Sequence, residues 1–329
     1  MPKILVRLPN WIGDTVMALP AINNIASHYK NDRIALLSRK SVLELFKEDE
    51  RFYKLYCIGN GKLQTIIDIS SVLRQEKFDT AILLQNAIGA AIIAKMSRIP
   101  ERIGYKTDFR RLLLTKPINL PEKPTTQDRY FLNMLKEAGI DSVYKDSYPL
   151  LNVTEKEMIW AEIALEKLDR PIILFFPGAA YGQAKRWPWK NFTALAKLLY
   201  ENIGGTIILI GSDIEKEIGA AIETAANVKN QIGKTTLRET MALLSNSDLL
   251  VTNDSGPMHI AAALGTPLIG IYGSTDPERT PPVGNGKKAI IYKNVSCSPC
   301  FLRTCPTDLK CMKQIGPSEV FETAKKLLF

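Results

Sequence analysis

Residues 248–272 read DLLVTNDSGPMHIAAALGTPLIGIY, and this stretch decides the fold. Two short apolar runs, residues 248–252 and 267–272, enclose a segment with helical spacing, residues 257–264, in which Pro257 marks a first helical turn. Apolar strands that alternate with helices are typical of a parallel sheet covered on both faces. The stretch therefore predicts a strand, a helix and a strand of an α/β protein.

The same alternation extends over most of the 329 residues. It is interrupted at residues 116–128, which contain three prolines, and it restarts after Pro171 with an apolar strand at residues 172–176. A domain usually takes roughly 100–200 residues, so this length suggests two domains. We expect two Rossmann-like α/β domains and a closing helix, at residues 1–165, 166–316 and 317–329.

Composition excludes several classes of protein. With 46% hydrophobic and 23% charged residues, the chain is globular rather than disordered or fibrous. Its net charge of +9 is spread evenly, without a basic tail, which suits an anionic partner but argues against nucleic acid. Polar residues interrupt every apolar stretch before it reaches the roughly 20 residues of a membrane span. We expect a cytoplasmic protein that meets a membrane only at its surface.

The loop after the first predicted strand, residues 9–14, reads PNWIGD. Ligands of open parallel sheets bind beyond the carboxyl ends of the strands, so such loops are candidate sites. Asp14 either caps the following helix or serves as a general base. Trp11 beside it is either a wall for a sugar ring or a core side chain.

A glycine-containing loop follows the predicted strand at residues 172–176. Its small residues, Gly178 among them, allow a ligand to approach the backbone closely. Lys185 and Arg186 at the end of this loop either meet a diphosphate or form a solvated basic turn.

Two further loops carry candidate residues. Ser255 and Gly256 precede the exposed amides of a helix N-terminus, which is a ready site for an anion, and His259 follows one turn later. After the strand at residues 206–210, Glu215 is either an acid that holds ribose hydroxyls or a first-turn acid of the next helix.

Two familiar nucleotide-binding fingerprints are missing. No G-x-G-x-x-G follows a predicted strand, which argues against a dinucleotide dehydrogenase. Residues 233–235, GKT, resemble the end of a phosphate-binding loop, but Val228 stands where its first glycine is needed. A kinase or ATPase is therefore poorly supported.

Four blocks in order along the chain resemble one known family: RLPNWIGDTVMALPA, FPGAAYGQAKRWP, VTNDSGPMHIAAALGTPLIGIYGSTDPERTPP and CSPCFLRTCP. They are similar to the ADP-heptose:lipopolysaccharide heptosyltransferases, glycosyltransferase family 9, and most similar to the heptosyltransferase II branch. The resemblance implies a GT-B fold, with an N-terminal acceptor domain, a C-terminal nucleotide-sugar domain and a last helix that crosses back to the first domain.

The resemblance also implies an activity. The expected reaction is an inverting, metal-independent transfer of L-glycero-D-manno-heptose from ADP-heptose to a lipopolysaccharide inner core that already carries one heptose on its Kdo–lipid A. A heptosyltransferase I or another nucleotide-diphosphate-sugar transferase is the first alternative. A non-catalytic nucleotide-sugar binding protein is the second.

The resemblance assigns roles residue by residue. Asp14 matches the catalytic aspartate, which would take the proton from the acceptor hydroxyl, and Lys185 matches the lysine that meets the diphosphate. The residues expected to bind the nucleotide sugar are Gly178, Ser212, Glu215, Thr235, Leu237, Asp254, Ser255, Gly256 and His259.

The acceptor side is expected to involve Asn10, Trp11, Arg98 and Arg102. The two arginines open a basic run that continues through Lys106, Arg110, Arg111 and Lys116. This run is either a solvated face or a contact for Kdo carboxylates and lipid A phosphates. The expected partners are the ADP-sugar donor, the glycolipid acceptor and the cytoplasmic face of the inner membrane.

Four of the five cysteines fall within fifteen residues, at Cys297, Cys300, Cys305 and Cys311. Their spacing is compatible with a structural zinc, with two disulfides or with four reduced thiols. None of these alternatives gives the cluster a catalytic role, and no cofactor is expected for catalysis.

Overall fold

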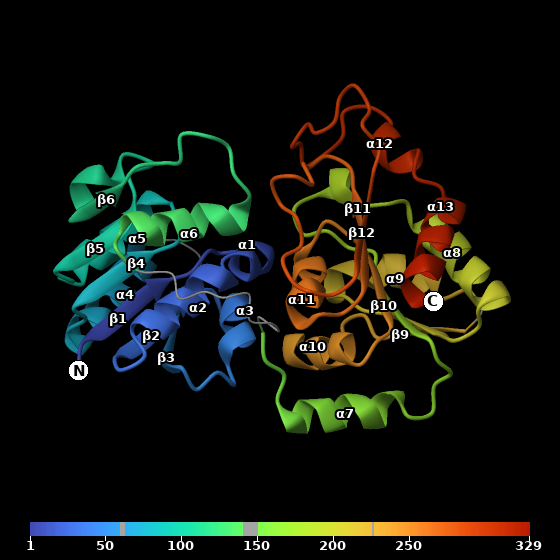
Figure 1. Cartoon of the computed structure of the whole chain (residues 1–329), viewed down its shortest axis with the longest axis horizontal. Coiled ribbons are helices and arrows are strands. Elements are labelled where there is room, and N and C mark those ends of the chain that lie inside the picture. Colours follow the sequence, from blue (N-terminus) through green and yellow to red (C-terminus); the bar gives the residue numbers. More distant parts are fainter. Residues whose placement is uncertain (60–62, 141–150, 226) are drawn as a thin grey trace. The chain divides into compact units, whose positions relative to one another are not determined.

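The computed structural model describes residues 1–59, 63–140, 151–225 and 227–329. The chain divides into two compact units, residues 1–150 and 151–329. Within the described residues, each unit holds a parallel six-stranded sheet with its helices (Figure 1). No helix in these ranges is both long and apolar enough to cross a membrane.

The sheet of the first unit has the order β3-β2-β1-β4-β5-β6. Its strands are β1 (Lys3–Arg7), β2 (Arg33–Ser38), β3 (Phe52–Cys57), β4 (Thr80–Leu83), β5 (Glu101–Tyr105) and β6 (Lys116–Ile118). Its helices are α1 (Ile12–Met17), α2 (Leu19–His28), α3 (Lys40–Leu43), α4 (Leu63–Glu76), α5 (Ile88–Met96) and α6 (Gln127–Glu137), with 3-10 turns η1 (Glu44–Phe46) and η2 (Arg110–Leu113). The order reverses between β1 and β4, which is where Rossmann-type sheets bind their ligands.

The central position of β1 explains its composition. It pairs in parallel with β2 on one side and β4 on the other, and Ile4, Leu5 and Val6 are almost fully buried. Because both faces of a central parallel strand are covered, its side chains are apolar without alternation. On one face of the sheet, Leu5 packs in a core with Leu73 of α4 and Ala91 of α5.

The second unit repeats this topology in the order β12-β11-β10-β7-β8-β9. Its strands are β7 (Ile172–Phe176), β8 (Thr206–Leu209), β9 (Val228–Asn230), β10 (Leu249–Asn253), β11 (Leu268–Tyr272) and β12 (Lys288–Tyr292). Its helices are α7 (Glu155–Leu165), α8 (Trp189–Asn202), α9 (Lys216–Ile222), α10 (Leu237–Ser245), α11 (Gly256–Leu264), α12 (Lys310–Lys313) and α13 (Pro317–Leu328), with 3-10 turns η3 (Gln183–Lys185) and η4 (Asp213–Glu215).

The stretch at residues 248–272 forms β10, α11 and β11, as its sequence predicts. All five residues of β10 are buried, and the strand pairs with β7 and β11 on its two sides. Gly265 ends α11 in the left-handed conformation, φ 84°, and Gly270 lets the Met258 sulfur pack directly on β11. The expected α/β fold class with two Rossmann-like sheets is confirmed.

Helix α7 belongs to the second unit, whereas we expected residues 1–165 to form the first domain. Arg238 of α10 donates to Glu157 of α7 at 2.5 Å, and both side chains are largely buried. Glu157 also closes the capping box of Thr154 at the start of α7. This charged helix is therefore fixed to α10, and the boundary between the units precedes it.

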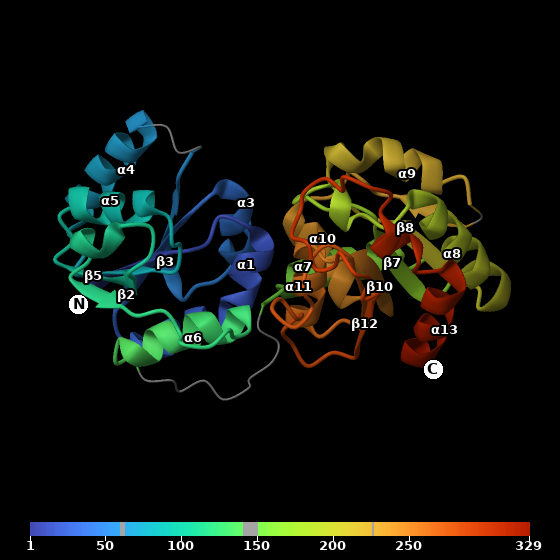
Figure 2. The same cartoon turned by 90° about the horizontal axis from the view of Figure 1, so that it is seen from above.

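Helix α13 also packs within the second unit, where the resemblance led us to expect a crossing to the first. Val320, Phe321 and Ala324 lie in the core of the second sheet, together with Phe192 and Leu199 of α8. The two helices lie side by side in both views (Figure 1 and Figure 2). The apolar face of α13 is thus already covered by its own unit.

Candidate functional site

An ion pair stands at the carboxyl edge of the second sheet. Asp254 follows β10 and is 4% exposed, and the Lys185 Nζ lies 2.6 Å from its Oδ2. Thr275, in the loop after β11, donates to the same oxygen at 2.6 Å. The His259 Nε2 lies 3.7 Å from the Asp254 Oδ1. The loops after β7, β10 and β11 therefore meet at one carboxylate.

The surroundings of Asp254 keep it ionised. Burial raises the pKa of its carboxyl group, but His259 and Lys185 lower it by more, so the pKa lies well below its usual range. His259 is 3% exposed, and its Nδ1 is buried without a hydrogen-bond partner in the described structure. The Lys185 ammonium group and the unpaired His259 Nδ1 therefore both lie near the start of α11.

Asn253, the last residue of β10, fixes the loop that carries Lys185. Its Nδ2 donates to the carbonyls of Pro177 and Gly178 at 2.9 and 3.0 Å, and its Oδ1 accepts from the Trp187 amide at 2.9 Å. Sequence reasoning missed this residue. The available signal was its position, at the end of a buried strand directly before Asp254.

Helix α11 begins at Gly256, after Ser255 at the N-cap position. The Ser255 side chain makes no cap hydrogen bond and lies 3.0 Å from the Thr252 hydroxyl instead. The first amides of this helix are therefore not consumed by their own cap. A helix N-terminus of this kind favours a phosphate.

The predicted residues Gly178, Ser212 and Glu215 also come together. Glu215 is 3% exposed, and its Oε2 accepts from the Ser212 amide at 3.0 Å and from the Ser212 hydroxyl at 2.6 Å. A Cβ on Gly178 would lie 2.6 Å from the Glu215 Oε1, so only glycine fits there. Of the two alternatives for Glu215, the structure shows the first-turn acid, which closes a capping box with Ser212.

The GKTT segment lies along the same edge, after β9. The Gly233 amide donates to the Gly211 carbonyl at 2.9 Å, next to Ser212. The Thr235 hydroxyl lies 3.0 Å from the Thr240 hydroxyl, and Leu237 is the first residue of α10. Thr235 and Leu237 thus follow β9 and stand beside the loop of Ser212. In the sheet, β7 and β8 lie between β9 and β10.

In the first unit, a buried arginine shapes the loop after β1. Arg7 donates to the Asn10 Oδ1 at 2.6 Å and to the Leu8 carbonyl at 2.5 Å. Burial and the charge of Arg39 lower the pKa of Arg7 to about 10, so it stays a cation at neutral pH. Sequence reasoning did not single out Arg7, because a cation inside a central strand reads as an interruption.

Asp14 and Trp11 follow in this loop and in α1. Asp14 is the third residue of α1 and partly exposed, while Trp11 occupies the N-cap position. Asp14 is therefore not the N-cap residue of this helix. It lies in the first turn, where its negative charge is favourable. Trp11 is 49% exposed, which excludes the core alternative, and the Arg39 guanidinium lies 5.8 Å from its ring.

The structure separates Arg98 and Arg102 from Asp14. Arg102 is the second residue of β5, at the amino edge of the sheet, whereas Asp14 follows the carboxyl end of β1. The Arg102 guanidinium also donates to the backbone carbonyls of Ile99, Pro100 and Leu113. Arg102 therefore stabilises the segments around the start of β5. Arg98, just before β5, lies at the same amino edge, so the structure does not bring either arginine to Asp14.

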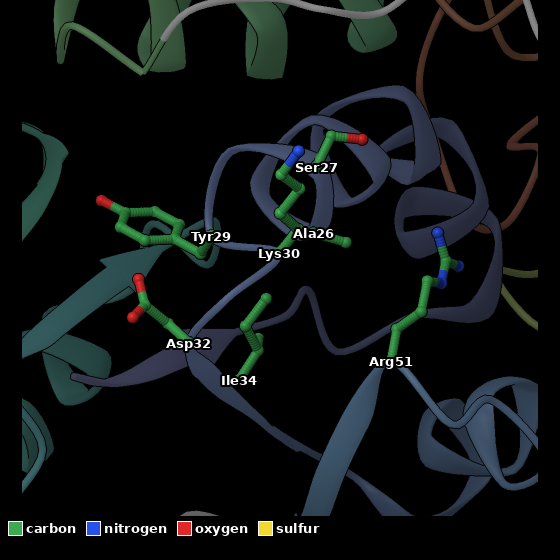
Figure 3. A pocket seen from close by; sticks show the side chains of 7 residues that line it. All are labelled: Ala26, Ser27, Tyr29, Lys30, Asp32, Ile34 and Arg51. Carbon is green, nitrogen blue, oxygen red and sulfur yellow. The ribbon is translucent and has the colours of Figure 1, made fainter. Parts of the chain in front are cut away.

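A surface cavity of about 470 Å³ lies at this amino edge too. It is lined by residues at the end of α2 and the start of β2, with Tyr29, Lys30 and Asp32 around its rim (Figure 3). Because the strands are parallel, this cavity and the loop of Asp14 belong to opposite edges of the sheet. It carries no part of the candidate site.

The cysteines are free thiols in the structure. Cys297 is exposed and Cys311 is buried, and burial raises the pKa of the Cys311 thiol. Among residues 1–59, 63–140, 151–225 and 227–329, no group of three or more His, Cys, Asp or Glu is placed to hold a metal ion. Within the described residues the cysteines form neither a disulfide nor a cluster of metal ligands, and the zinc, disulfide and thiol alternatives stay predictions.

The segment between Cys300 and Cys305 contacts the loop of Lys185. The Ala184 amide donates to the Arg303 carbonyl at 3.0 Å, and the Tyr181 hydroxyl donates to the Phe301 carbonyl at 2.7 Å. Gly182 is needed because a Cβ there would lie 2.2 Å from the Arg303 carbonyl oxygen. The cysteine-rich segment thus supports the loop of Lys185.

Comparison with known proteins gives consistent likenesses. Residues 66–311 match Glycosyltransferase family 9 (heptosyltransferase). The chain is 31% identical over 308 residues to lipopolysaccharide heptosyltransferase 2 of Salmonella typhimurium, covering 88% of this chain and 87% of that one. It is 33% identical over 313 residues to lipooligosaccharide heptosyltransferase 2 of Haemophilus influenzae, covering 88% of each. The solved structure of E. coli ADP-heptose lps heptosyltransferase II superposes with a TM-score of 0.84 at 28% identity, over 99% of this chain and 98% of that one.

Proposed function

This chain belongs to glycosyltransferase family 9, the heptosyltransferases, and we propose that it transfers L-glycero-D-manno-heptose from ADP-heptose to the inner core of lipopolysaccharide. In this proposal the acceptor already carries one heptose, as the resemblance to the heptosyltransferase II branch implies. The single observation that carries the proposal is the buried Lys185–Asp254–His259 group at the start of α11, on a Rossmann-type sheet.

The second unit holds the donor in this proposal. Lys185 and the first amides of α11 bind the diphosphate, and Asp254 holds Lys185 in place. Negative charge grows on the departing ADP as the glycosidic bond breaks, so a fixed cation there stabilises the transition state more than the ground state. Lys185 supplies this charge without a metal ion. The nucleoside lies further along the edge, toward Gly178, Ser212, Glu215, Thr235 and Leu237.

The first unit binds the acceptor, with Asn10, Trp11 and Asp14 as its contacts. Asp14 takes the proton from the acceptor hydroxyl while that oxygen attacks the anomeric carbon. The new C–O bond forms as the bond from the anomeric carbon to the diphosphate breaks, and ADP leaves with the bonding electrons. A single displacement of this kind inverts the anomeric centre. The reaction takes place at the cytoplasmic face of the inner membrane, where the glycolipid is held.

The deciding experiment is a transfer assay with product mass measured. ADP-heptose is offered with lipid A bearing Kdo alone or with lipid A bearing Kdo and one heptose. We expect one heptose to be added to the second acceptor. Transfer to the first acceptor only would assign the chain to the heptosyltransferase I reaction. Activity that persists in EDTA supports metal independence, and activity restored only by a divalent ion contradicts it.

Asp14→Asn tests the base. The variant keeps the size of the side chain but not its basicity, so we expect ADP binding to be retained and transfer to fall roughly 100-fold or more. The control is Asp169→Asn, which changes an exposed carboxylate of the second unit. Undiminished turnover of the Asp14 variant removes it as the base.

A further inference from the structure

Large apolar side chains stand exposed along the carboxyl edge of the first sheet. Phe109 and Leu112, in the loop after β5, are 98% and 88% exposed. Ile88, the first residue of α5 after β4, is 42% exposed, and Trp11 after β1 is 49% exposed. Because parallel strands end at one edge, Trp11, Ile88 and Phe109 come from neighbouring loops on the same side of the sheet, and Leu112 follows in the η2 turn that leads back toward β6. Large apolar side chains exposed to this extent at one edge point to an interaction surface.

The loop after β5 presents its apolar tips to solvent. Asp108 and Phe109 both adopt the left-handed conformation, at φ 50° and 59°, which non-glycine residues rarely accept. The next residue, Arg110, is fully buried and donates to the carbonyls of Tyr105 and Gln85 at 2.7 and 2.5 Å. The Arg110 side chain thus fills the buried space under this loop. The Phe109 ring stays in solvent.

Cations flank these tips. Lys106 and Arg111 are exposed on either side of Phe109, and Asp108 is the one acid between them. Apolar side chains that protrude next to lysine and arginine are typical of segments that lie in the interface of an anionic bilayer. A protein partner would more commonly meet a continuous apolar patch than single protruding tips.

We propose that the loop at residues 106–113 docks the first unit on an anionic membrane. Phe109 and Leu112 enter the boundary between headgroups and acyl chains, and Lys106 and Arg111 lie at the lipid phosphates. The purpose of this contact, though not the contact itself, rests on the proposed function. β5 lies two strands from β1, roughly 10 Å along the sheet, so a membrane-held glycolipid is presented at the edge that carries Asp14.

The test is co-sedimentation of the full chain with vesicles that contain phosphatidylglycerol, compared with vesicles of phosphatidylcholine alone. We expect binding to the anionic vesicles that weakens with added salt. Phe109→Ser with Leu112→Ser lowers the partition coefficient roughly tenfold or more. Lys106→Gln with Arg111→Gln removes the salt-dependent part.

The matched control is Ile159→Ser with Ile163→Ser, which changes two exposed apolar side chains of α7 in the second unit. This control binds vesicles like the unchanged protein. Unchanged melting temperatures show that the variants fold, since all the altered side chains are exposed. If the Phe109/Leu112 variant binds vesicles as strongly as the unchanged protein, the proposal is overturned. It is also overturned if the substitutions change sedimentation equally in the absence of vesicles, because the loop then governs self-association.

Transfer assays separate this inference from the proposed function. The Phe109/Leu112 variant keeps full activity on a deacylated acceptor in solution and loses activity on the acceptor in vesicles. Vesicle binding without heptose transfer by the unchanged protein contradicts the proposed function and leaves the membrane contact standing. Equal loss of activity on both acceptors shows that the loop acts in the site itself, and overturns the membrane role.

Discussion

Lys185→Met provides the sharpest test of the donor site, because it removes one charge of a buried pair and keeps the aliphatic stem. The Lys185 and Asp254 side chains are 13% and 4% exposed, and their charged atoms lie 2.6 Å apart. Removal of one partner from a buried pair costs about 3–5 kcal/mol. Thr275 and His259 remain beside Asp254, so we expect a loss of about 3 kcal/mol in unfolding free energy.

The same variant is expected to lose nucleotide affinity. A hydrogen bond to a charged group contributes about 1.5–3 kcal/mol, so ADP binding by calorimetry should weaken roughly 10- to 150-fold. A cycle with Asp254→Asn and the double variant separates the two effects. In the double variant the destabilisation is smaller than the sum by about 2 kcal/mol, whereas the affinity stays low.

The pH dependence carries a definite sign. The folded-state pKa of Asp254 is depressed, so the contribution of the pair is fully present above the unfolded value, near about 4, and is lost as the pH falls through the lower folded value. The gap in stability between the unchanged protein and Lys185→Met should be constant from roughly pH 5 to 8 and should narrow in acid.

The control for this prediction is a lysine outside the ion pair. Lys190→Met changes an exposed lysine of α8 and should alter neither property. If Lys185→Met unfolds within about 0.5 kcal/mol of the unchanged protein and binds ADP equally well, the ion pair neither stabilises the site nor serves the diphosphate.

Two further predictions concern the neighbourhood of this site. Gly178→Ala forces a Cβ onto the buried Glu215 and should destabilise the fold by about 1–3 kcal/mol in denaturant melts, with weaker ADP binding, while Gly316→Ala, where nothing lies within 4 Å, should be neutral. The buried Cys311, with its raised pKa, should react with a thiol reagent more slowly than the exposed Cys297 in the folded protein. Equal protection of both thiols would indicate a bound metal or a disulfide.

The sequence predicts buried elements better than edge elements. The strands β1, β7, β10 and β11 are central, so their apolar runs are long enough to recognise. The edge strands β6 and β9 have three residues each and β12 is partly exposed, while β6 also contains Pro117, which an edge strand tolerates. The segment after residues 9–14 forms two helices, α1 and α2, that meet at Ala18, and Pro20 in the first turn of α2 marks this break.

The candidate site divides in the same way. Residues that directly follow a strand, such as Lys185 and Asp254, are found from the sequence because topology alone brings strand ends together. Thr275 and Asn253 were missed because their contacts depend on side-chain geometry across different loops. The basic run misled us for a related reason. Composition cannot distinguish Arg110, whose side chain is buried, from Arg111, whose side chain is exposed.

The contact between Ala184 and Arg303 has a consequence for the order of synthesis. The loop of Lys185 leaves the ribosome more than a hundred residues before the segment that supports it, and the Trp187 indole donates to the carbonyl of Ile315, later still. A nascent chain can therefore complete the strands of the second sheet while the loop of Lys185 still lacks its support. If this loop binds the donor as we propose, chains that end before residues 303–315 would not sequester the sugar nucleotide.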